Sequence, residues 1–393
     1  MENSPIIKKL SEFGEGFKHH HENYSAASIS AIRETGGAWQ LGGMTFYFPE
    51  HFGFCYGVDK AIDMVFETCE RFMDKRIFLT DQLIHNPYIN GRLREKGVRY
   101  LKRDAQNLLV CEGLEQGDVV VVSAFGTDFR DILRLREKGV TIVDSTCGAI
   151  INVWKRVEGY AKKGFITIVH GKRNHEETRA TLSQAVKEGG SYLAIENISE
   201  AKELAEVVLG ERSGSDFVGA HPGCAFSEDY SFDAATCKMG MANQTTMLKG
   251  ESLEIQNILR GAFLERFGEN ETRERFRSFD TICGATQDRQ DALRNLLKKP
   301  LDLLLIVGGF NSSNTTHLAE IAQGKLPFFH MEASEDILSA DEIRSRDPRT
   351  GRTEVRRDWF PPGAKKIGIT SGASTPDVTL FEIIQKMTEL RHC

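Results

Sequence analysis

The sequence lacks long apolar runs and the familiar targeting and nucleotide-binding patterns. Its longest apolar stretches, residues 119–122 and 301–307, are far shorter than the roughly 20 residues that span a bilayer. Residues 1–45 have no basic start followed by an apolar stretch, which argues against secretory or organellar targeting. Neither a Walker-type lysine motif nor a Gly-x-Gly-x-x-Gly fingerprint follows a predicted strand, which disfavours nucleotides. We therefore expect a cytoplasmic protein with no membrane partner.

The chain is also short of cysteine and of positive charge. Eight cysteines in 393 residues are too few and too scattered for a secreted disulfide framework, so we expect thiols or metal ligands. The formal net charge of −6 leaves no general attraction to phosphate backbones, so we expect no nucleic-acid partner. Hydrophobic residues at 40% and charged residues at 27% are typical of a soluble globular protein, here of about two to four domains.

Short β-rich runs alternate with helical patterns after a polar leader, residues 1–43. Most of the runs lead into Gly, Ser, Asn or His and then a helical pattern, which predicts parallel α/β architecture with ligand sites beyond the strands' carboxyl ends. The expected strands are 44–48, 76–79, 119–123, 141–143, 166–169, 192–195, 301–307 and 366–370. We expect segments 213–239 and 339–363 to be surface excursions. The leader's His19, His20 and His21 are expected to be solvated, and we assign them no chemistry.

An internal similarity surrounds three of the cysteines. The run Asp-Ser-Thr-Cys-Gly-Ala at 144–149 closely matches Asp-Thr-Ile-Cys-Gly-Ala at 280–285, and Phe-Cys-Tyr-Gly at 54–57 opens a third helical pattern. A threefold repeat of one unit is the natural interpretation. Each cysteine (Cys55, Cys147, Cys283) would lie in a turn entering a helix, where the helix dipole and free N–H groups favour the thiolate that binds metals.

Three converging thiolates without a fourth would leave a metal open to substrate, unlike structural zinc and electron-transfer iron–sulfur sites, which usually have four protein ligands. The alternative is that these cysteines merely pack at tight turns. The remaining cysteines lack the repeat context, and we expect them to be structural: Cys69, Cys111, Cys224, Cys237 and Cys393.

Neutral hydrogen-bonding groups follow two other predicted strands, at 308–314 and 370–376, and such helix entries can cradle an anion without lysine. His85 and His175 stand in similar loops, and histidine can donate a charged hydrogen bond to phosphate near neutral pH. Glu177 is a candidate proton relay. Without the surrounding motifs, it would be interpreted as a carboxylate at the start of a helix. Segment 243–246 adds hydroxyl groups. Together these groups predict an anion-binding, acid–base site.

The residues resemble the 4-hydroxy-3-methylbut-2-enyl diphosphate reductase family over nearly the whole chain after the leader. Eight motifs occur in the family's order: 53–58, 84–87, 144–147, 175–178, 244–246, 281–287, 311–314 and 371–376. The resemblance implies an α/β fold of three pseudo-equivalent lobes, each a small, mostly parallel sheet with flanking helices, around a central iron–sulfur site. We assign the lobes to 56–147, 148–279 and 280–388, with 44–55 joining the third.

The resemblance also implies the site. The cofactor would be a [4Fe–4S] cluster with three cysteine ligands, Cys55, Cys147 and Cys283, and an iron open to the substrate's allylic oxygen. Glu177 would supply protons and Thr245 would orient the reacting hydroxyl. The substrate-binding residues would be His85, His175, Gln244, Thr245, Ser312, Ser313, Asn314 and Ser374.

In that family the reaction adds two electrons and two protons, releases water, and gives isopentenyl and dimethylallyl diphosphate. With no flavin or nicotinamide fingerprint in the chain, a ferredoxin or flavodoxin donor is implied. Phe125 stands where many members have a diphosphate-binding His, and Gly148 replaces a common Pro. Phe125 and the 243–251 segment resemble the plant and cyanobacterial branch. From the residues alone two alternatives stay open, an iron–sulfur hydro-lyase and a non-enzymatic zinc or diphosphate-binding protein.

Overall fold

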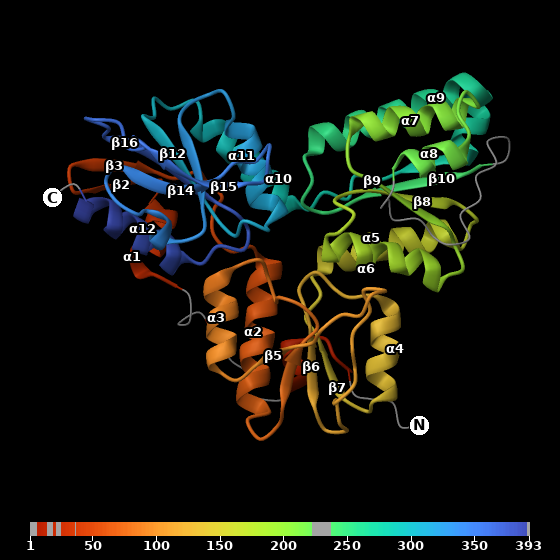
Figure 1. The fold of residues 1–393 in the computed structure, drawn as a ribbon, viewed down its shortest axis with the longest axis horizontal. Coiled ribbons are helices and arrows are strands. Elements are labelled where there is room, and N and C mark those ends of the chain that lie inside the picture. The colour runs from red at the N-terminus through yellow and green to blue at the C-terminus, as the bar shows by residue number, and fades with distance from the viewer. Residues whose placement is uncertain (1–5, 14–18, 21–24, 36, 222–236, 391–393) are drawn as a thin grey trace. The chain divides into compact units, whose positions relative to one another are not determined.

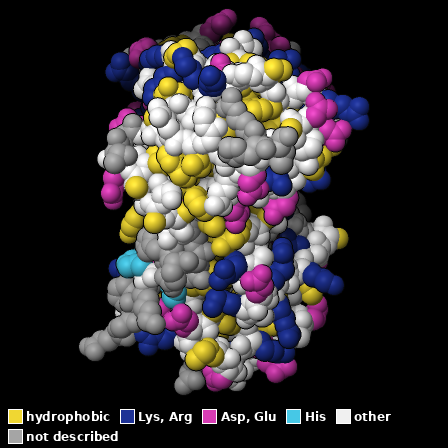
Figure 2. Space-filling view, turned by 90° about the vertical axis from the view of Figure 1, so that its left-hand side faces the viewer, with side chains coloured by type: hydrophobic (Ala, Val, Ile, Leu, Met, Phe, Trp, Pro, Cys, Tyr) yellow, Lys and Arg dark blue, Asp and Glu magenta, His cyan; other side chains and the backbone are white. Residues whose placement is uncertain are grey.

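The computed structural model describes residues 6–13, 19–20, 25–35, 37–221 and 237–390. The chain forms two compact units, each built from two stretches of sequence. Unit 1 comprises Met1–Ile6 and Leu101–Cys283, and unit 2 comprises Ile7–Tyr100 and Gly284–Cys393. Among the described residues, no helix combines the length and apolar character needed to cross a membrane. Basic and acidic side chains lie intermingled on the face shown in Figure 2.

Unit 1 contains a four-stranded sheet in the order β11-β10-β8-β9, with every neighbouring pair parallel. Helices cover both faces, α5 and α6 on one and α7 and α9 on the other (Figure 1), and apolar side chains fill the space between the layers. The strands are β8 (Ile166–His170), β9 (Tyr192–Ile195), β10 (Met239–Asn243) and β11 (Phe276–Ser278). The helices are α5 (Gly148–Ala161), α6 (Glu176–Lys187), α7 (Ile198–Leu209), α8 (Gly214–Ala220) and α9 (Lys249–Arg275). The unit also holds the parallel pair β6 (Val119–Val122) and β7 (Thr141–Asp144), joined through α4 (Phe129–Glu137).

Unit 2 contains a five-stranded sheet in the order β13-β12-β16-β3-β2, parallel except for the β2–β3 pair. One face packs on α1 and α12 and the other on α10 and α11. The strands are β2 (Ala38–Leu41), β3 (Met44–Tyr47), β12 (Leu303–Val307), β13 (Phe328–Met331) and β16 (Lys366–Ser371). The helices of this layer are α1 (Ala27–Thr35), α10 (Gly284–Leu296), α11 (Ser313–Ala322) and α12 (Asp377–Leu390). The unit also holds α2 (Tyr56–Arg71), α3 (Pro87–Glu95), β4 (Ile77–Leu79) and β5 (Arg99–Tyr100). Short elements of this unit are η1 (Leu10–Phe13) and η3 (Ser334–Asp336), whereas β1 (Ile6–Ile7) has one residue in each unit.

The α/β class is confirmed, and each of the eight expected strands is present within two residues of its predicted bounds. The three-lobe assignment stays a prediction. Segment 339–363 is mostly at the surface, as expected, but it is not irregular: it forms the antiparallel pair β14 (Glu342–Arg346) and β15 (Thr353–Arg357), and Ile343 and Trp359 anchor it in the core of unit 2. Segment 213–239 begins with α8, and its residues 222–236 lie outside the described part.

The leader also differs from expectation. His20 is 1% exposed rather than solvated, because it lies against carboxylates of α2, whereas His19 is largely exposed and His21 lies outside the described residues. Ile29 and Ile32 of α1 pack into the core of unit 2.

Tyr160 of α5 lies directly on the backbone of β10 in unit 1. A Cβ added to Gly240 would come within 2.3 Å of the Tyr160 ring, and the Tyr160 hydroxyl donates to the carbonyl of Met241 at 3.1 Å. The ring is buried. The absence of a side chain at Gly240 therefore sets the distance between the helix after Cys147 and the strand before Thr245.

We expect Gly240→Ala to lower the free energy of unfolding by about 1–3 kcal/mol, since the buried ring must shift in a filled core. Urea denaturation followed by circular dichroism measures the change. Gly159→Ala is the matched control, because this α5 glycine has open space around it and alanine favours helix by about 0.5–1 kcal/mol. Equal stability of the two variants would contradict the close packing.

Candidate active site

Each of the three repeat cysteines stands at the start of a helix. Cys55 and Cys147 occupy the N-cap positions of α2 and α5 with extended backbones, and Cys283 directly precedes α10. None of the three is in a disulfide, and all three are partly exposed. The predicted placement of each cysteine in a turn entering a helix is confirmed. Backbone N–H groups at such a turn favour the thiolate form.

The other described cysteines have different surroundings. Cys69, Cys111 and Cys237 are buried. Burial raises the pKa of the Cys69 thiol to about 11 and also raises the pKa of Cys111, so both stay protonated at neutral pH. Such protonated, buried thiols fit a structural role. Cys224 and Cys393 lie outside the described residues.

The sequence repeat in unit 1 is also a repeat of turn geometry. The Asp144 carboxylate accepts a hydrogen bond from the N–H of Thr146 at 3.1 Å, and the Asp280 carboxylate accepts one from Ile282 at the same distance. An aspartate that binds the backbone two residues on forms a compact local turn. The residue after each turn is a repeat cysteine, so the two thiols are presented by the same local structure.

A buried carboxyl group links two of the predicted site residues to Cys283. Glu177, in the first turn of α6, is 1% exposed, and its Oε1 accepts a hydrogen bond from the N–H of Thr245 at 2.6 Å. The carbonyl of Thr245 in turn accepts from the N–H of Cys283 at 3.1 Å. Glu177, Thr245 and Cys283 therefore form one connected group within unit 1.

His175 and Phe125 extend this group toward Cys147. His175 caps α6, and its Nδ1 accepts from the N–H of Glu177 at 3.2 Å, so the neutral ring carries its proton on Nε2. The ring meets Phe125 edge-to-face, with centroids 5.4 Å apart. The neighbouring Ala124 carbonyl accepts from the N–H of Cys147 at 3.0 Å. Phe125 thus supplies an apolar wall beside His175 instead of a second imidazole.

The Gln244 side chain forms hydrogen bonds that stabilise the loop in which it lies. Its Oε1 accepts from the N–H of Lys172 at 3.0 Å and from the Thr178 hydroxyl at 3.3 Å, and its Nε2 donates to the Thr246 hydroxyl at 2.9 Å. These bonds tie the end of β10 to the loop after β8. The structure therefore gives Gln244 a positioning role, and its contact with substrate stays a prediction.

In unit 2, Cys55 belongs to a second connected group. Its N–H donates to the carbonyl of Ala373 at 3.2 Å, and the N–H of Ala373 donates to the Asn314 side chain at 3.1 Å. The other end of the Asn314 amide donates to the Thr286 hydroxyl at 3.3 Å. The loop before α12 and the start of α11 are thereby fixed to the cysteine turn.

His85 is held against the same two loops. The Ser374 hydroxyl donates to the His85 carbonyl at 3.4 Å, and a Cβ added to Gly309 would lie 2.2 Å from that carbonyl oxygen. Only glycine permits this approach. Ser312 caps α11, and the hydroxyl of Ser313 is buried with no hydrogen-bond partner among the described residues.

The structure therefore gathers the predicted residues into two groups, one in each unit. Unit 1 holds Cys147, His175, Glu177, Gln244, Thr245 and Cys283. Unit 2 holds Cys55, His85, Ser312, Ser313, Asn314 and Ser374.

Arg289, which no sequence motif marked as a site residue, supports the Cys55 turn. Its guanidinium donates to the carbonyl of Gly53 at 2.6 Å and to that of Ala285 at 2.8 Å, and the residue is 5% exposed. Gly53 has φ +77, a conformation that favours glycine. An arginine at the start of a helical pattern looks like a solvated charge, so the sequence contains no signal for this contact.

The buried environment of Glu177 changes its acid–base behaviour. Burial raises the pKa of this carboxyl to about 7, and the hydrogen bonds from Thr245 oppose the rise only in part. The group is therefore half protonated near neutral pH and can donate a proton there.

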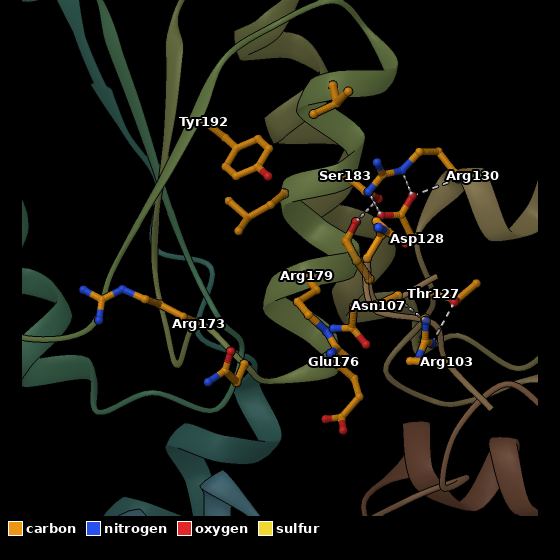
Figure 3. A pocket seen from close by; sticks show the side chains of 16 residues that line it. Arg103, Asn107, Thr127, Asp128, Arg130, Arg173, Glu176, Arg179, Ser183 and Tyr192 are labelled. Carbon is orange, nitrogen blue, oxygen red and sulfur yellow. Dashed lines mark hydrogen bonds and ion pairs between the residues drawn. The ribbon is translucent and has the colours of Figure 1, made fainter. Parts of the chain in front are cut away.

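Unit 1 also contains a cavity of about 210 Å³ beside α6, shown in Figure 3. Two of its arginines are bound to carboxylates: Arg103 lies 3.0 Å from Asp131, and Arg130 lies 2.7 Å from Asp128. None of the predicted site residues lines it.

Comparison with known proteins adds independent findings. A family model described as LytB protein matches residues 47–388. A 4-hydroxy-3-methylbut-2-enyl diphosphate reductase of Gloeobacter violaceus is 41% identical over 94% of this chain and 88% of its own length. One of Thermosynechococcus vestitus is 40% identical over 96% and 94%.

Two solved structures are also similar. A structure of (E)-4-hydroxy-3-methyl-but-2-enyl diphosphate reductase, titled the terminal enzyme of the non-mevalonate pathway, has a TM-score of 0.53 and 25% identity, and the match covers 88% of this chain and 99% of that one. A reductase structure from Plasmodium falciparum has a TM-score of 0.64 and 21% identity over 87% of each chain, a likeness of fold alone.

We expect the protonated Glu177 carboxyl to titrate with a midpoint near pH 7, well above the usual range for glutamate. Infrared difference spectra between wild type and Glu177→Gln, recorded across pH, isolate the carboxylic-acid band of this residue. The band should weaken as pH rises through about 7. A band already absent at pH 5.5 would contradict the buried, poorly solvated environment.

Proposed function

This chain belongs to the LytB family and is an oxidoreductase that removes the hydroxyl group from 4-hydroxy-3-methylbut-2-enyl diphosphate, the last step of the non-mevalonate isoprenoid pathway; we propose which of its residues carry out the reaction. The products are isopentenyl and dimethylallyl diphosphate. The observation that carries the proposal is the buried Glu177–Thr245 contact, which joins an acid of shifted pKa to the turn of Cys283.

The family uses an iron–sulfur cluster, and we propose Cys55, Cys147 and Cys283 as the three protein ligands of a [4Fe–4S] cluster. The donor set fits such a group, because three partly exposed cysteines outside any disulfide stand at helix starts that favour thiolates, and thiolates are the usual ligands of iron–sulfur clusters. When bound, the cluster supplies single electrons and a Lewis-acidic iron for the substrate hydroxyl. Arg289 holds the Cys55 turn in place through Gly53.

The diphosphate is held by neutral donors and histidines. We assign this role to His85, His175, Ser312, Ser313, Asn314 and Ser374, with Gln244 shaping the loop beside them. The Ser313 hydroxyl supports the assignment, because a buried polar group without a partner among the described residues is costly unless a ligand satisfies it. Asn314 is preoriented by its bonds to Ala373 and Thr286.

Glu177 is the proton donor and Thr245 orients the reacting hydroxyl. Two electrons and two protons are consumed as the C–O bond breaks, one proton leaving with the hydroxyl as water and the other ending on the allylic carbon chain. At pH 7 the carboxyl of Glu177 is present in both protonation states, so it can release a proton and accept a replacement. Its bond to the Thr245 backbone sets its place beside that residue.

The electrons come from an external one-electron carrier, which we propose to be a ferredoxin or a flavodoxin. The sequence has no flavin or nicotinamide fingerprint that would provide electrons within the chain. Product formation in the absence of any electron donor would instead indicate a hydro-lyase, in which water leaves without net reduction.

We expect Cys147→Ser to lose most of its iron, sulfide and activity, because a hydroxyl is a poor ligand for an iron–sulfur cluster. Metal and sulfide analysis of anaerobically purified protein, with electron paramagnetic resonance of the reduced sample, provides the measurement. Cys111→Ala is the control, since that thiol is buried and protonated, and it should keep its cluster. Zinc in place of iron in the wild type would refute the cofactor assignment.

We expect Glu177→Gln to lower kcat by about 10²–10⁴-fold with little change in substrate affinity, because the amide cannot donate the proton. Wild-type kcat should fall as pH rises through about 7, where the carboxyl loses its proton, and the variant should lack this dependence. Steady-state kinetics with a chemically reduced donor tests both points. Glu188→Gln, at the far end of the same helix, should behave as wild type. Unchanged kcat in Glu177→Gln would refute the assignment.

A further inference from the structure

A group of histidine and acidic side chains lies on α2 of unit 2, apart from the residues assigned above. We propose that His20, Glu67 and Glu70 form a binding site for a divalent metal ion of the zinc type. All three ligand atoms lie within 4.8 Å of one another. The site joins the leader segment to the helix that begins after Cys55.

The helix presents its carboxylates at a spacing that places them on one face. Asp63, Glu67 and Glu70 are four and three residues apart, so their side chains point the same way from α2. Glu67 is 2% exposed and His20, which approaches from the leader, is 1% exposed. Burial of a carboxylate is costly unless cations or donors surround it, and an imidazole beside two carboxylates is a metal-ligand set.

One separation in the cluster fits two ligands of the same ion. The His20 Nε2 lies 3.4 Å from a Glu67 oxygen, which is a long hydrogen bond. It is also close to the roughly 3.3–3.6 Å between two ligands bound to one zinc ion at about 2.0–2.2 Å in tetrahedral geometry. The Glu70 oxygen lies nearer the other ring nitrogen, 3.7 Å from Nδ1. The Nε2 of His20 and one oxygen of Glu67 would bind the ion, and the half-exposed Glu70 side chain would turn to give a second oxygen.

A second layer of contacts holds the ligands in place. Asp63 accepts from the backbone N–H of His20 at 2.7 Å and lies 2.5 Å from the His19 ring, so it fixes the leader at this point. Arg71 donates to the other oxygen of Glu67 at 2.7 Å. Metal sites commonly have such supporting bonds around their ligands.

The cluster is rich in carboxylates. Asp63, Glu67 and Glu70 bring three of them to one face of α2, and Arg71 binds Glu67. Glu70 is 44% exposed and leaves a path from solvent, where water can complete the coordination.

Nitrogen and carboxylate donors select the class of metal. Magnesium and calcium prefer sites made of oxygen alone, and thiolate-selective metals would need cysteine, whereas imidazole with carboxylates suits zinc. A bound ion would fasten residue 20 to the second half of α2. Because binding to the folded form alone stabilises it, zinc should raise the thermal stability of the whole chain.

The test uses full-length holoenzyme, purified without oxygen and dialysed against zinc chloride at low micromolar concentration and then against metal-free buffer. We expect about one zinc per chain in addition to the iron, measured by mass spectrometry of the elements, and a zinc-dependent rise in melting temperature. His20→Gln and Glu67→Gln should lower zinc affinity at least tenfold in a chelator competition, and Asp63→Asn by about 10-fold through loss of the supporting bond.

Glu70→Gln tests the site without disturbing the fold, because that side chain is half exposed and its replacement leaves the buried contacts intact. It should keep the wild-type iron content and the zinc-free melting temperature while losing zinc affinity. His221→Gln is the matched control, since it removes a histidine bound to a single carboxylate, Glu203, at 2.9 Å, and it should bind zinc as wild type does. Less than 0.1 zinc per wild-type chain, or equal affinity in wild type and Glu70→Gln, would overturn the proposal and leave the cluster as an ion-pair latch.

Discussion

The hydrogen bond between the Thr245 backbone and the buried Glu177 carboxyl is the contact on which the candidate site most depends. It joins the first turn of α6 to the residues after β10, and through the Thr245 carbonyl it reaches the turn of Cys283. The same burial that makes this bond strong disfavours a charged carboxylate. Position and acidity of one side chain therefore have a common cause.

Each unit builds its own group of candidate residues in the same way, from loops beyond the ends of parallel strands. β7 leads to Cys147 and β10 to Thr245, while β12 and β16 lead to Ser313 and Ser374. The sheets are buried under helices on both faces, so these loops have firm anchors. Glycines without room for a Cβ, such as Gly309 against His85, allow the loops to approach one another closely.

What could be predicted from the sequence was local. The strands, the turns before helices and the repeated Asp-x-x-Cys pattern depend on neighbouring residues, and the two aspartate turns have matching geometry. The burial of His20 and the contact of Arg289 with Gly53 depend on residues far apart in sequence. The residues next to His20 and Arg289 in the sequence do not indicate the distant groups that bury them. Both side chains would therefore be expected to be exposed to solvent.

The near-complete enclosure of Glu177 also sets a condition on repeated turnover. One carboxyl holds one proton, yet each catalytic cycle consumes two, so the group must be recharged from outside while only 1% of the residue is exposed. The bond from the backbone N–H of Glu177 to His175 fixes this turn and does not itself bring a proton to the carboxyl. Turnover then depends on how the enclosed carboxyl is reprotonated as well as on the breaking of the C–O bond, and more so as the pH rises.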